Sequence, residues 1–354
     1  MDQQTAFRRA EKQYKVRDGL LDWSTVIDLS ASSHTEGVHE LCLAHDLCSP
    51  PALPFQLFTR TRPRAFTIDG HPGLIIIPNP FTDEAQRWLA RKCLCDCTKP
   101  PNRTNLDPFF ELPSTSLFTL ASESNDTTRP QCLIDSRILS DSFDSTVTKP
   151  KDTFYSQPAS PRALLDRLRW CTLGWQYNWT TKLYDLGVSE FDPELNELMQ
   201  AIAVTITDPT REAANSCSDN TYDGTQYESH AGIINYYDER ATMAGHVDKT
   251  EENMDAPLIS FNIGLDCVYL IGGTTRDTVP TPVLLRSGDV LAMCGESRLA
   301  YHGVPKILAN TSPACLTDLD AGNNDVVAGK YPQWQYFAPY LSTHRVNCNA
   351  RKCL

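Results

Sequence analysis

The stretch AGIINYYDERATMAGHVDKTEENMDAPLISFNIGLDCVYLI, residues 231–271, decides the fold class. It contains three apolar runs of strand length, separated by segments rich in Asp, Glu, Asn and Gly, and two more such runs follow. The runs are residues 231–237, 258–264, 267–271, 283–285 and 290–294. Short runs separated by turn residues at intervals of roughly a dozen are typical of an antiparallel sandwich or barrel. We therefore predict a mainly β domain with flanking helices.

The N-terminal part of the chain lacks this regular series of short apolar runs. Residues 1–30 predict an amphipathic helix, a turn and a short apolar stretch. Residues 31–70 are rich in Ser, Pro and Thr and show little periodicity, so we expect an extended arm on the surface. The run Leu74-Ile75-Ile76-Ile77 predicts a strand, and Thr82 is placed to cap a helix that follows it.

These differences in residue composition and periodicity divide the chain at residue 160. We expect residues 1–160 to form a helical and loop extension packed on the core, with a loop in the Pro- and Ser-rich residues 98–155. Residues 161–354 would then form the catalytic-type domain. A short helix is expected over residues 161–170, and Asp192-Pro193 begins the clearest helix, since Asp suits the N-cap and Pro the first helical position.

The net charge limits the ways in which the chain could bind nucleic acid, and its cysteine content indicates the compartment. The net charge is -12, which argues against a chain that binds nucleic acid through an extended basic face. Two local basic segments, residues 8–17 and 59–64, remain candidate RNA contacts. The 13 cysteines are an odd number, and residues 1–17 lack the apolar middle of a secretory signal, so we expect an intracellular protein with reduced thiols. The nucleus, the mitochondrion and the cytoplasm are the candidate compartments.

The sequence lacks the patterns of a membrane span and of a structural zinc site. No apolar run approaches the ~18 residues of a membrane span, so no membrane partner is expected. The run Cys93-x-Cys95-x-Cys97 lacks a matching downstream pair at zinc spacing, which favours ordinary thiols at the end of a helix over a zinc site.

A metal site is indicated by Gly245-His246-Val247-Asp248. On a strand, His246 and Asp248 point to the same face, so an imidazole and a carboxylate can bind one metal ion. His302, which follows a strand and precedes a glycine, is the best candidate for a third ligand, with His230 and His344 as rivals. Two His and one carboxylate suit iron(II) better than structural zinc.

An anion site is indicated near the end of the chain. Arg345, Asn347 and Arg351 lie at even offsets, so they share one face of a strand. Two guanidinium groups facing one cavity would repel each other unless an anion lay between them, and Arg is suited to bidentate carboxylate binding. A dicarboxylic acid fits that arrangement. The alternative is three solvated residues near a chain terminus.

Taken together, these residues resemble the AlkB family of iron(II)- and 2-oxoglutarate-dependent dioxygenases, which act on alkylated nucleobases. The matching motifs are Asn235-x-Tyr237, His246-x-Asp248, Gly288-Asp289, Gly295-Glu296-Ser297-Arg298, His302-Gly303 and Arg345-x-Asn347-x-x-x-Arg351. The resemblance implies a double-stranded β-helix, or jelly roll, with iron(II), 2-oxoglutarate and O2 as cofactor and co-substrates. This chain departs from the family pattern at Asn349, where Thr is usual, and in ending at Leu354, three residues after Arg351, where relatives often continue; the second departure makes closure of the last strand a question for the structure.

The resemblance also implies roles for individual residues. His246, Asp248 and His302 look like the iron ligands. Arg345 would pair with the distal carboxylate of 2-oxoglutarate with help from Tyr237, while three further residues would hold the end near the metal. Two aromatic residues match a nucleotide-recognition lid, and one arginine matches a substrate contact. These further residues are Asn235, Asn347 and Arg351 for the co-substrate, and Trp175, Tyr177 and Arg276 for the substrate.

Without the resemblance, the aromatic residues of the proposed lid would be assigned to the hydrophobic core. Trp175, Tyr177 and Trp179 alternate as on a strand, and three large rings on one face are more often core.

The function implied is oxidative demethylation of methyladenine in nucleic acid by a monomer, with transfer RNA favoured and DNA as a second candidate. Oxidation of methylcytosine in transfer RNA is a further candidate. Two rival interpretations are an oxygenase acting on a protein such as a histone tail, and a binding module that has lost turnover.

Overall fold

The computed structural model describes residues 4–16, 21–30, 36–43, 45–110, 112, 114–123, 160–178, 181, 183–185, 189–207 and 222–354. Arg17, Trp179 and much of the expected loop in residues 98–155 lie outside this part of the chain.

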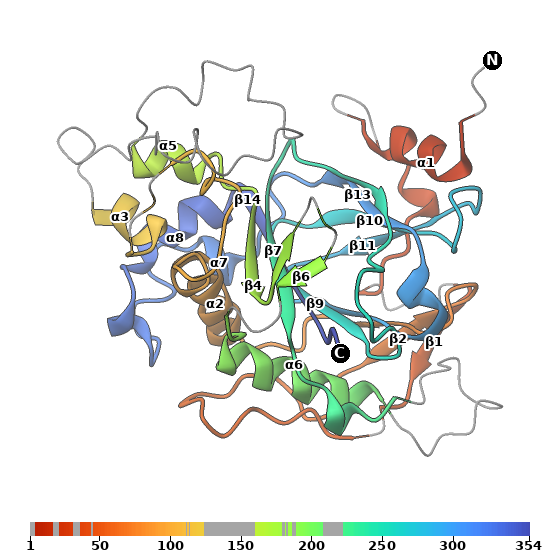
Figure 1. The fold of residues 1–354 in the computed structure, drawn as a ribbon, viewed down its shortest axis with the longest axis horizontal. Coiled ribbons are helices and arrows are strands. Elements are labelled where there is room, and N and C mark those ends of the chain that lie inside the picture. Colours follow the sequence, from red (N-terminus) through yellow and green to blue (C-terminus); the bar gives the residue numbers. More distant parts are fainter. Residues whose placement is uncertain are drawn as a thin grey trace.

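Two antiparallel sheets form the centre of the protein (Figure 1). The large sheet has eight strands in the order β1 (Val38–Leu41), β2 (Ala65–Ile68), β3 (Leu74–Ile77), β12 (Val290–Met293), β9 (Leu258–Gly264), β14 (His344–Arg351), β7 (Ala231–Asp238) and β4 (Trp170–Gly174). The small sheet has four in the order β11 (Thr281–Leu285), β10 (Cys267–Ile271), β13 (His302–Ile307) and β8 (Met243–His246). A separate hairpin pairs β5 (Gln176–Asn178) with β6 (Leu183–Asp185).

The two sheets pack face to face, and side-chain alternation explains why. Ile76 of β3 and Leu291 of β12 belong to an inner cluster that also contains Tyr269 of β10 in the small sheet. Ile75 and Ile77 point the other way, into a second cluster formed with the helices. β3 and β12 therefore bury both faces. The predicted jelly roll is confirmed.

Helices cover the outer faces. The outer face of the large sheet is packed by α2 (Asp83–Arg91) and α6 (Pro193–Ile206), while α1 (Ala6–Tyr14) packs on the small sheet, on the other side of the molecule (Figure 1). The remaining α-helices are α3 (Leu117–Glu123), α5 (Pro161–Leu165), α7 (Ala314–Thr317) and α8 (Trp334–Leu341). Short helical turns are η1 (Trp23–Thr25), η2 (Lys92–Asp96), η5 (Gly224–Gln226), η6 (Gly295–Leu299) and η7 (Ala328–Lys330).

The expected helix starts are confirmed. The Thr82 hydroxyl accepts the Ala85 N–H at 3.1 Å, and the Asp192 carboxylate accepts the Leu195 N–H at 3.0 Å. Such caps satisfy backbone donors that the first helical turn leaves unpaired. None of the helices in the described ranges combines the length and apolar character needed to cross a bilayer.

Two sequence expectations were wrong. Residues 31–70 do not form only a surface arm, because β1 and β2 extend the edge of the large sheet, so the N-terminal segment supplies three sheet strands. The helix expected over residues 161–170 ends at Leu165, and Trp170 already begins β4. The Cys93, Cys95 and Cys97 thiols are buried in and just after η2, the helical turn that follows α2.

A buried ion-pair cluster holds the segment before α8 against α2. Asp325 lies 2.6 Å from the Arg87 guanidinium and 2.5 Å from that of Arg91, and all three side chains are at most 10% exposed. The cluster anchors the segment after β13 to the helical layer.

Candidate metal centre

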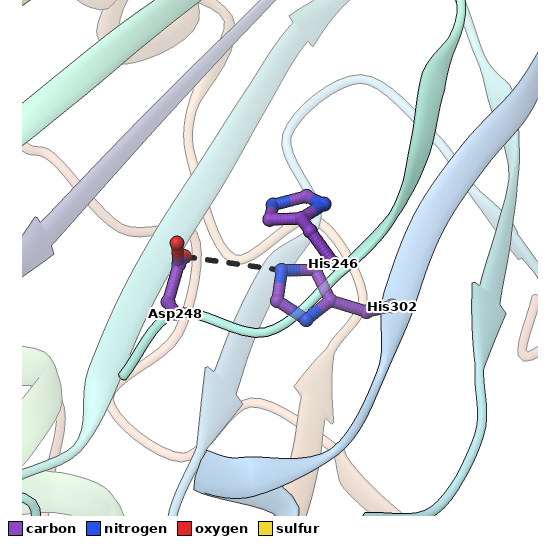
Figure 2. A group of neighbouring side chains, drawn as sticks. All are labelled: His246, Asp248 and His302. Carbon is purple, nitrogen blue, oxygen red and sulfur yellow. Dashed lines mark ion pairs between the residues drawn. The ribbon is translucent and has the colours of Figure 1, made fainter. Parts of the chain in front are cut away.

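Two His and one Asp meet at the open end of the small sheet. His246 ends β8, His302 begins β13, and the two residues are direct partners in the ladder. Asp248 follows β8 by two residues, and its carboxylate lies 3.9 Å from His302 Nε2 (Figure 2). One ligand atom from each residue lies within 4.8 Å of the other two. The sequence thus predicted a set that the fold brings together, whereas the rivals His230 and His344 lie outside it.

Hydrogen bonds orient both imidazoles for metal binding. His246 Nδ1 lies 2.9 Å from the Ala244 carbonyl, and His302 Nδ1 lies 3.1 Å from the Ala300 carbonyl. A carbonyl only accepts, so each Nδ1 carries the proton and each Nε2 has its lone pair free. Fixing the tautomer through the second ring nitrogen is how metal-binding His is usually arranged.

The charges at this site also suit a cation. Burial lowers the pKa of His302 to about 4, so its imidazole is neutral near pH 7. For Asp248, burial alone would raise the pKa, but the Arg351 guanidinium beside it holds the pKa well below its usual range. The centre therefore offers two imidazole nitrogens and one carboxylate, a donor set that fits iron(II).

The edge of β8 is covered by α1, which explains the glycine before His246. A Cβ on Gly245 would lie 2.4 Å from the Phe7 ring, so only glycine leaves room for it. The Gly245 N–H donates to the Glu11 carboxylate, and the Gly245 carbonyl accepts from Arg276 at 2.7 Å. Since β8 is the last strand of its sheet, these side chains satisfy backbone groups that would otherwise be unpaired.

The predicted co-substrate residues line a cavity between the sheets. Asn235 and Tyr237 of β7 face Asn347 and Arg345 of β14 as direct ladder partners. All four line the cavity that also contains the three candidate metal ligands.

Arg345 is the strongest sign of an anion site in this cavity. Its side chain is buried, and its guanidinium donates to the Leu265 carbonyl at 2.8 Å and to the Asn262 amide oxygen. Among the described residues, no carboxylate lies within ion-pair distance of it. A buried guanidinium that has only neutral partners fits one carboxylate of a dicarboxylic acid.

Arg351 lies beside the metal site rather than deep in the cavity. It donates to Asp248 at 3.3 Å, to Glu251 at 3.0 Å and to the Asn349 amide oxygen at 2.7 Å. Asn349, which departs from the family pattern, thus orients Arg351. The last strand closes fully, since Arg351 still pairs with Ala231 of β7.

The three expected substrate residues have different surroundings. The Trp175 ring stacks on His230 with centroids 4.3 Å apart. Tyr177 packs against Tyr184, 5.2 Å between centroids, and lies close enough to Asp248 and Arg351 for both to influence its pKa, which burial raises. The Arg276 guanidinium, besides its bond to Gly245, lies over the Tyr301 ring at 5.0 Å.

Sequence reasoning assigned no role to four polar residues that support the site, although Arg298 stood in one of the matching motifs. Asn262 contacts both Arg345 and Asn347, and Glu11 contacts β8. Glu251 and Arg298 form a buried ion pair at 2.8 Å. Glu251 lies three residues after Asp248, a proximity that could have drawn attention to it.

Comparisons with known proteins agree with this geometry. Residues 134–351 match the 2OG-Fe(II) oxygenase superfamily. The chain is 33% identical to "Nucleic acid dioxygenase ALKBH1" of Mus musculus over 99% of this chain and 84% of that protein. It is 32% identical to "tRNA demethylase abh1" of Schizosaccharomyces pombe, over 99% and 97%. It is 28% identical to "DNA N(6)-methyladenine demethylase ALKBH1A" of Arabidopsis thaliana, over 98% and 96%.

The match to the superfamily covers more than half of the chain, and the mouse and fission-yeast relatives align over nearly all of it. The His246, Asp248 and His302 cluster and the buried Arg345 line one cavity. The chain therefore belongs to the 2OG-Fe(II) oxygenases, within the AlkB family, and is an iron(II)- and 2-oxoglutarate-dependent dioxygenase.

Proposed function

We propose that this dioxygenase oxidatively demethylates N-methylated bases, above all methyladenine, in nucleic acid, and that transfer RNA is its main substrate. The observation that carries the proposal is that the His246, Asp248 and His302 cluster and Arg345 line the same cavity. When bound, iron(II), 2-oxoglutarate and O2 would together supply the oxidant that hydroxylates the methyl group. On nitrogen, the resulting hydroxymethyl group leaves as formaldehyde.

The chain's own residues position these components. His246, Asp248 and His302 would bind iron(II), and the hydrogen bonds at each Nδ1 keep the ligand nitrogens aimed at it. Arg345 would bind the distal carboxylate of 2-oxoglutarate, with Tyr237 beside it. Asn235, Asn347 and Arg351 would hold the end near the metal (Asn347 and Asn235 face each other across β14 and β7).

Substrate recognition is assigned to the residues around the opening. Tyr177 on the hairpin would stack on a base that has left its helix, since an aromatic ring stacks on any base. Trp175 at the foot of the hairpin and Arg276 beside β8 complete the proposed substrate contacts.

Transfer RNA is favoured over duplex DNA by charge. A chain of net charge -12 is better suited to a folded RNA recognised by shape than to a long run of duplex phosphates. The basic segment at residues 59–64 is partly neutralised, because Arg62 pairs with Asp46 and Arg64 with Glu40 at the surface. The names of the fission-yeast and Arabidopsis relatives support transfer RNA and DNA methyladenine respectively as substrates to test.

The test compares wild type, His246→Ala and the control His39→Ala, whose ring pairs with Asp69 at the surface. Each protein is incubated with iron(II), 2-oxoglutarate and total transfer RNA, and modified nucleosides are quantified by mass spectrometry. We expect loss of methyladenine with wild type and His39→Ala, and none with His246→Ala. Equal loss with all three proteins would exclude the proposed metal site.

Parallel incubations decide the substrate class. Methyladenine DNA and histones are the alternative substrates, and conversion of methylcytosine to a hydroxymethyl or formyl product is followed in the same RNA digests. Demethylation of histones alone would replace the nucleic-acid proposal by the protein one. We also propose that the enzyme acts as a monomer in the nucleus or mitochondrion, which light scattering and imaging of the tagged full chain would check.

A further inference from the structure

A buried carboxylate that the proposed chemistry does not use lies next to the metal site. The Glu251 side chain is fully buried, and it forms ion pairs with Arg298 at 2.8 Å and with Arg351 at 3.0 Å. The Tyr184 hydroxyl donates to the same carboxylate at 2.7 Å. Burying a charge is costly unless it is paired and hydrogen-bonded, and Glu251 meets both conditions with three donors.

The three donors come from three separate parts of the fold. Arg298 belongs to η6, which precedes His302, and Arg351 ends β14. Tyr184 belongs to β6 of the hairpin, whose two strands form a sheet of their own. Glu251 thus joins the hairpin to elements that carry the metal site.

Both arginines also contact Asp248, each at a different atom. Arg351 donates to the Asp248 carboxylate at 3.3 Å, and Arg298 donates to the Asp248 backbone carbonyl. A continuous chain of polar contacts therefore runs from Tyr184 through Glu251 and the arginines to a candidate metal ligand. Tyr177, the proposed base-stacking residue, packs on Tyr184 at the outer end of this chain.

Contacts at the foot of the hairpin and on its second strand help to hold it. At its foot, Gly174 adopts a φ of +64°, and a Cβ there would lie 2.3 Å from the His230 carbonyl oxygen, so glycine allows the chain to leave β4. Trp175 then donates its N–H to that carbonyl at 2.8 Å and stacks on the His230 ring. The second strand is held by the contact between Tyr184 and Glu251.

We propose that Glu251 is a positioning residue that seats the β5–β6 hairpin over the metal site and draws Arg351 away from Asp248. The Tyr184 hydroxyl is the contact through which Glu251 fixes β6, on which Tyr177 packs. The inference rests on the proposed function for its account of substrate binding, but the hairpin contact itself can be measured without turnover.

The first test measures amide hydrogen exchange in the full-length protein without substrate. Tyr184→Phe keeps the ring and removes only the hydroxyl, and Tyr336→Phe on α8 is the matched control, being exposed and remote from the site. We expect the amides of β5 and β6 to exchange about tenfold faster in Tyr184→Phe, the effect of losing one hydrogen bond to a charged acceptor. Unchanged exchange of the hairpin in Tyr184→Phe would overturn the proposal.

The second test measures cation binding by Glu251→Gln, which keeps the shape of the side chain and removes its charge. Arg351 would then have Asp248 as its only carboxylate partner among the described residues, and its positive charge would compete with a metal ion. We expect the dissociation constant for Mn²⁺, measured by electron paramagnetic resonance, to rise about tenfold. An unchanged constant would refute the role assigned to Arg351.

The third test uses turnover of a stem-loop RNA that carries one N-methyladenine. Tyr184→Phe should raise the KM for the RNA about tenfold and leave the KM for 2-oxoglutarate within about twofold of wild type. A parallel rise of both constants would show general damage to the site and contradict a hairpin-specific role. If wild type does not demethylate this RNA, the proposed substrate fails, while the exchange measurement still decides the hairpin contact.

Discussion

The contact between Phe7 and Gly245 can be tested by removing or crowding the ring. Phe7 is fully buried between two glycines, one on β8 and one, Gly272, just after β10. A methyl group on Gly245 would lie 2.4 Å from one ring carbon and 2.6 Å from the next, distances that side chains do not sustain. Gly245→Ala should therefore expel the ring and loosen α1 from the strand that ends in His246.

The expected free-energy changes follow from burial. Phe7→Ala should lower the free energy of unfolding by about 3 kcal/mol, as for a large-to-small core substitution. Gly245→Ala should cost about 2 kcal/mol, most of the burial energy of one Phe side chain. In the double variant, the ring that clashed is gone, so the total should be about 3 kcal/mol rather than the additive value of about 5 kcal/mol. The coupling between the two sites is then about 2 kcal/mol.

Urea unfolding followed by circular dichroism measures the free energy of unfolding of wild type, the two single variants and the double variant. Gly329→Ala is the matched control, because a Cβ at Gly329 meets no atom within 4 Å. It should change the free energy of unfolding by less than about 0.5 kcal/mol. Additive losses in the double variant would show that the ring and the glycine do not depend on each other, which would refute this account of the glycine before His246.

Three further outcomes can be stated. Asn262→Asp would place a carboxylate against Arg345 and should raise the KM for 2-oxoglutarate by about 30-fold, which corresponds to about half of a ~4 kcal/mol charge interaction. Asn262→Ala should raise this KM far less, and equal effects of the two substitutions would contradict an anion site at Arg345. Asp325→Asn should lower the free energy of unfolding by about 3 kcal/mol, because it leaves the Arg91 charge buried without a carboxylate, and a loss below about 1 kcal/mol would disprove this. Burial opposes ionisation of Glu251, but its arginine partners lower its pKa from 4.5 to about 2. Its contribution to stability is therefore present above pH 4.5 and lost as the pH falls towards 2. The free energies of unfolding of wild type and Glu251→Gln should diverge in that window, and parallel acid titrations would show that this is wrong.

Residues whose roles follow from spacing could be predicted from the sequence. The two-residue spacing of His246 and Asp248 and the even offsets along residues 345–351 translate directly into a shared face. The structure brings together the three candidate ligands and lines one cavity with Asn235, Tyr237, Arg345 and Asn347. Their assignment to iron and 2-oxoglutarate stays a prediction until ligands are measured.

Residues whose roles depend on distant partners could not be predicted in this way. β1 has two exposed residues in its centre and no clear alternation, and its partner β2 lies more than twenty residues further along the chain. Nothing local marks such an edge strand. Glu11 and Glu251 look like ordinary surface acids in the sequence, because only the folded chain shows that each is buried against a polar partner.

The cover that α1 provides for β8 has a consequence for proteolytic processing. Phe7 and Glu11, which contact β8, both belong to α1, so one cut after this helix would remove them together. Cleavage after α1 would leave the unpaired edge of β8 open, and an open edge is a template for pairing with another chain. A trimmed form should therefore self-associate through the strand that carries His246, so aggregation and loss of metal binding would develop together.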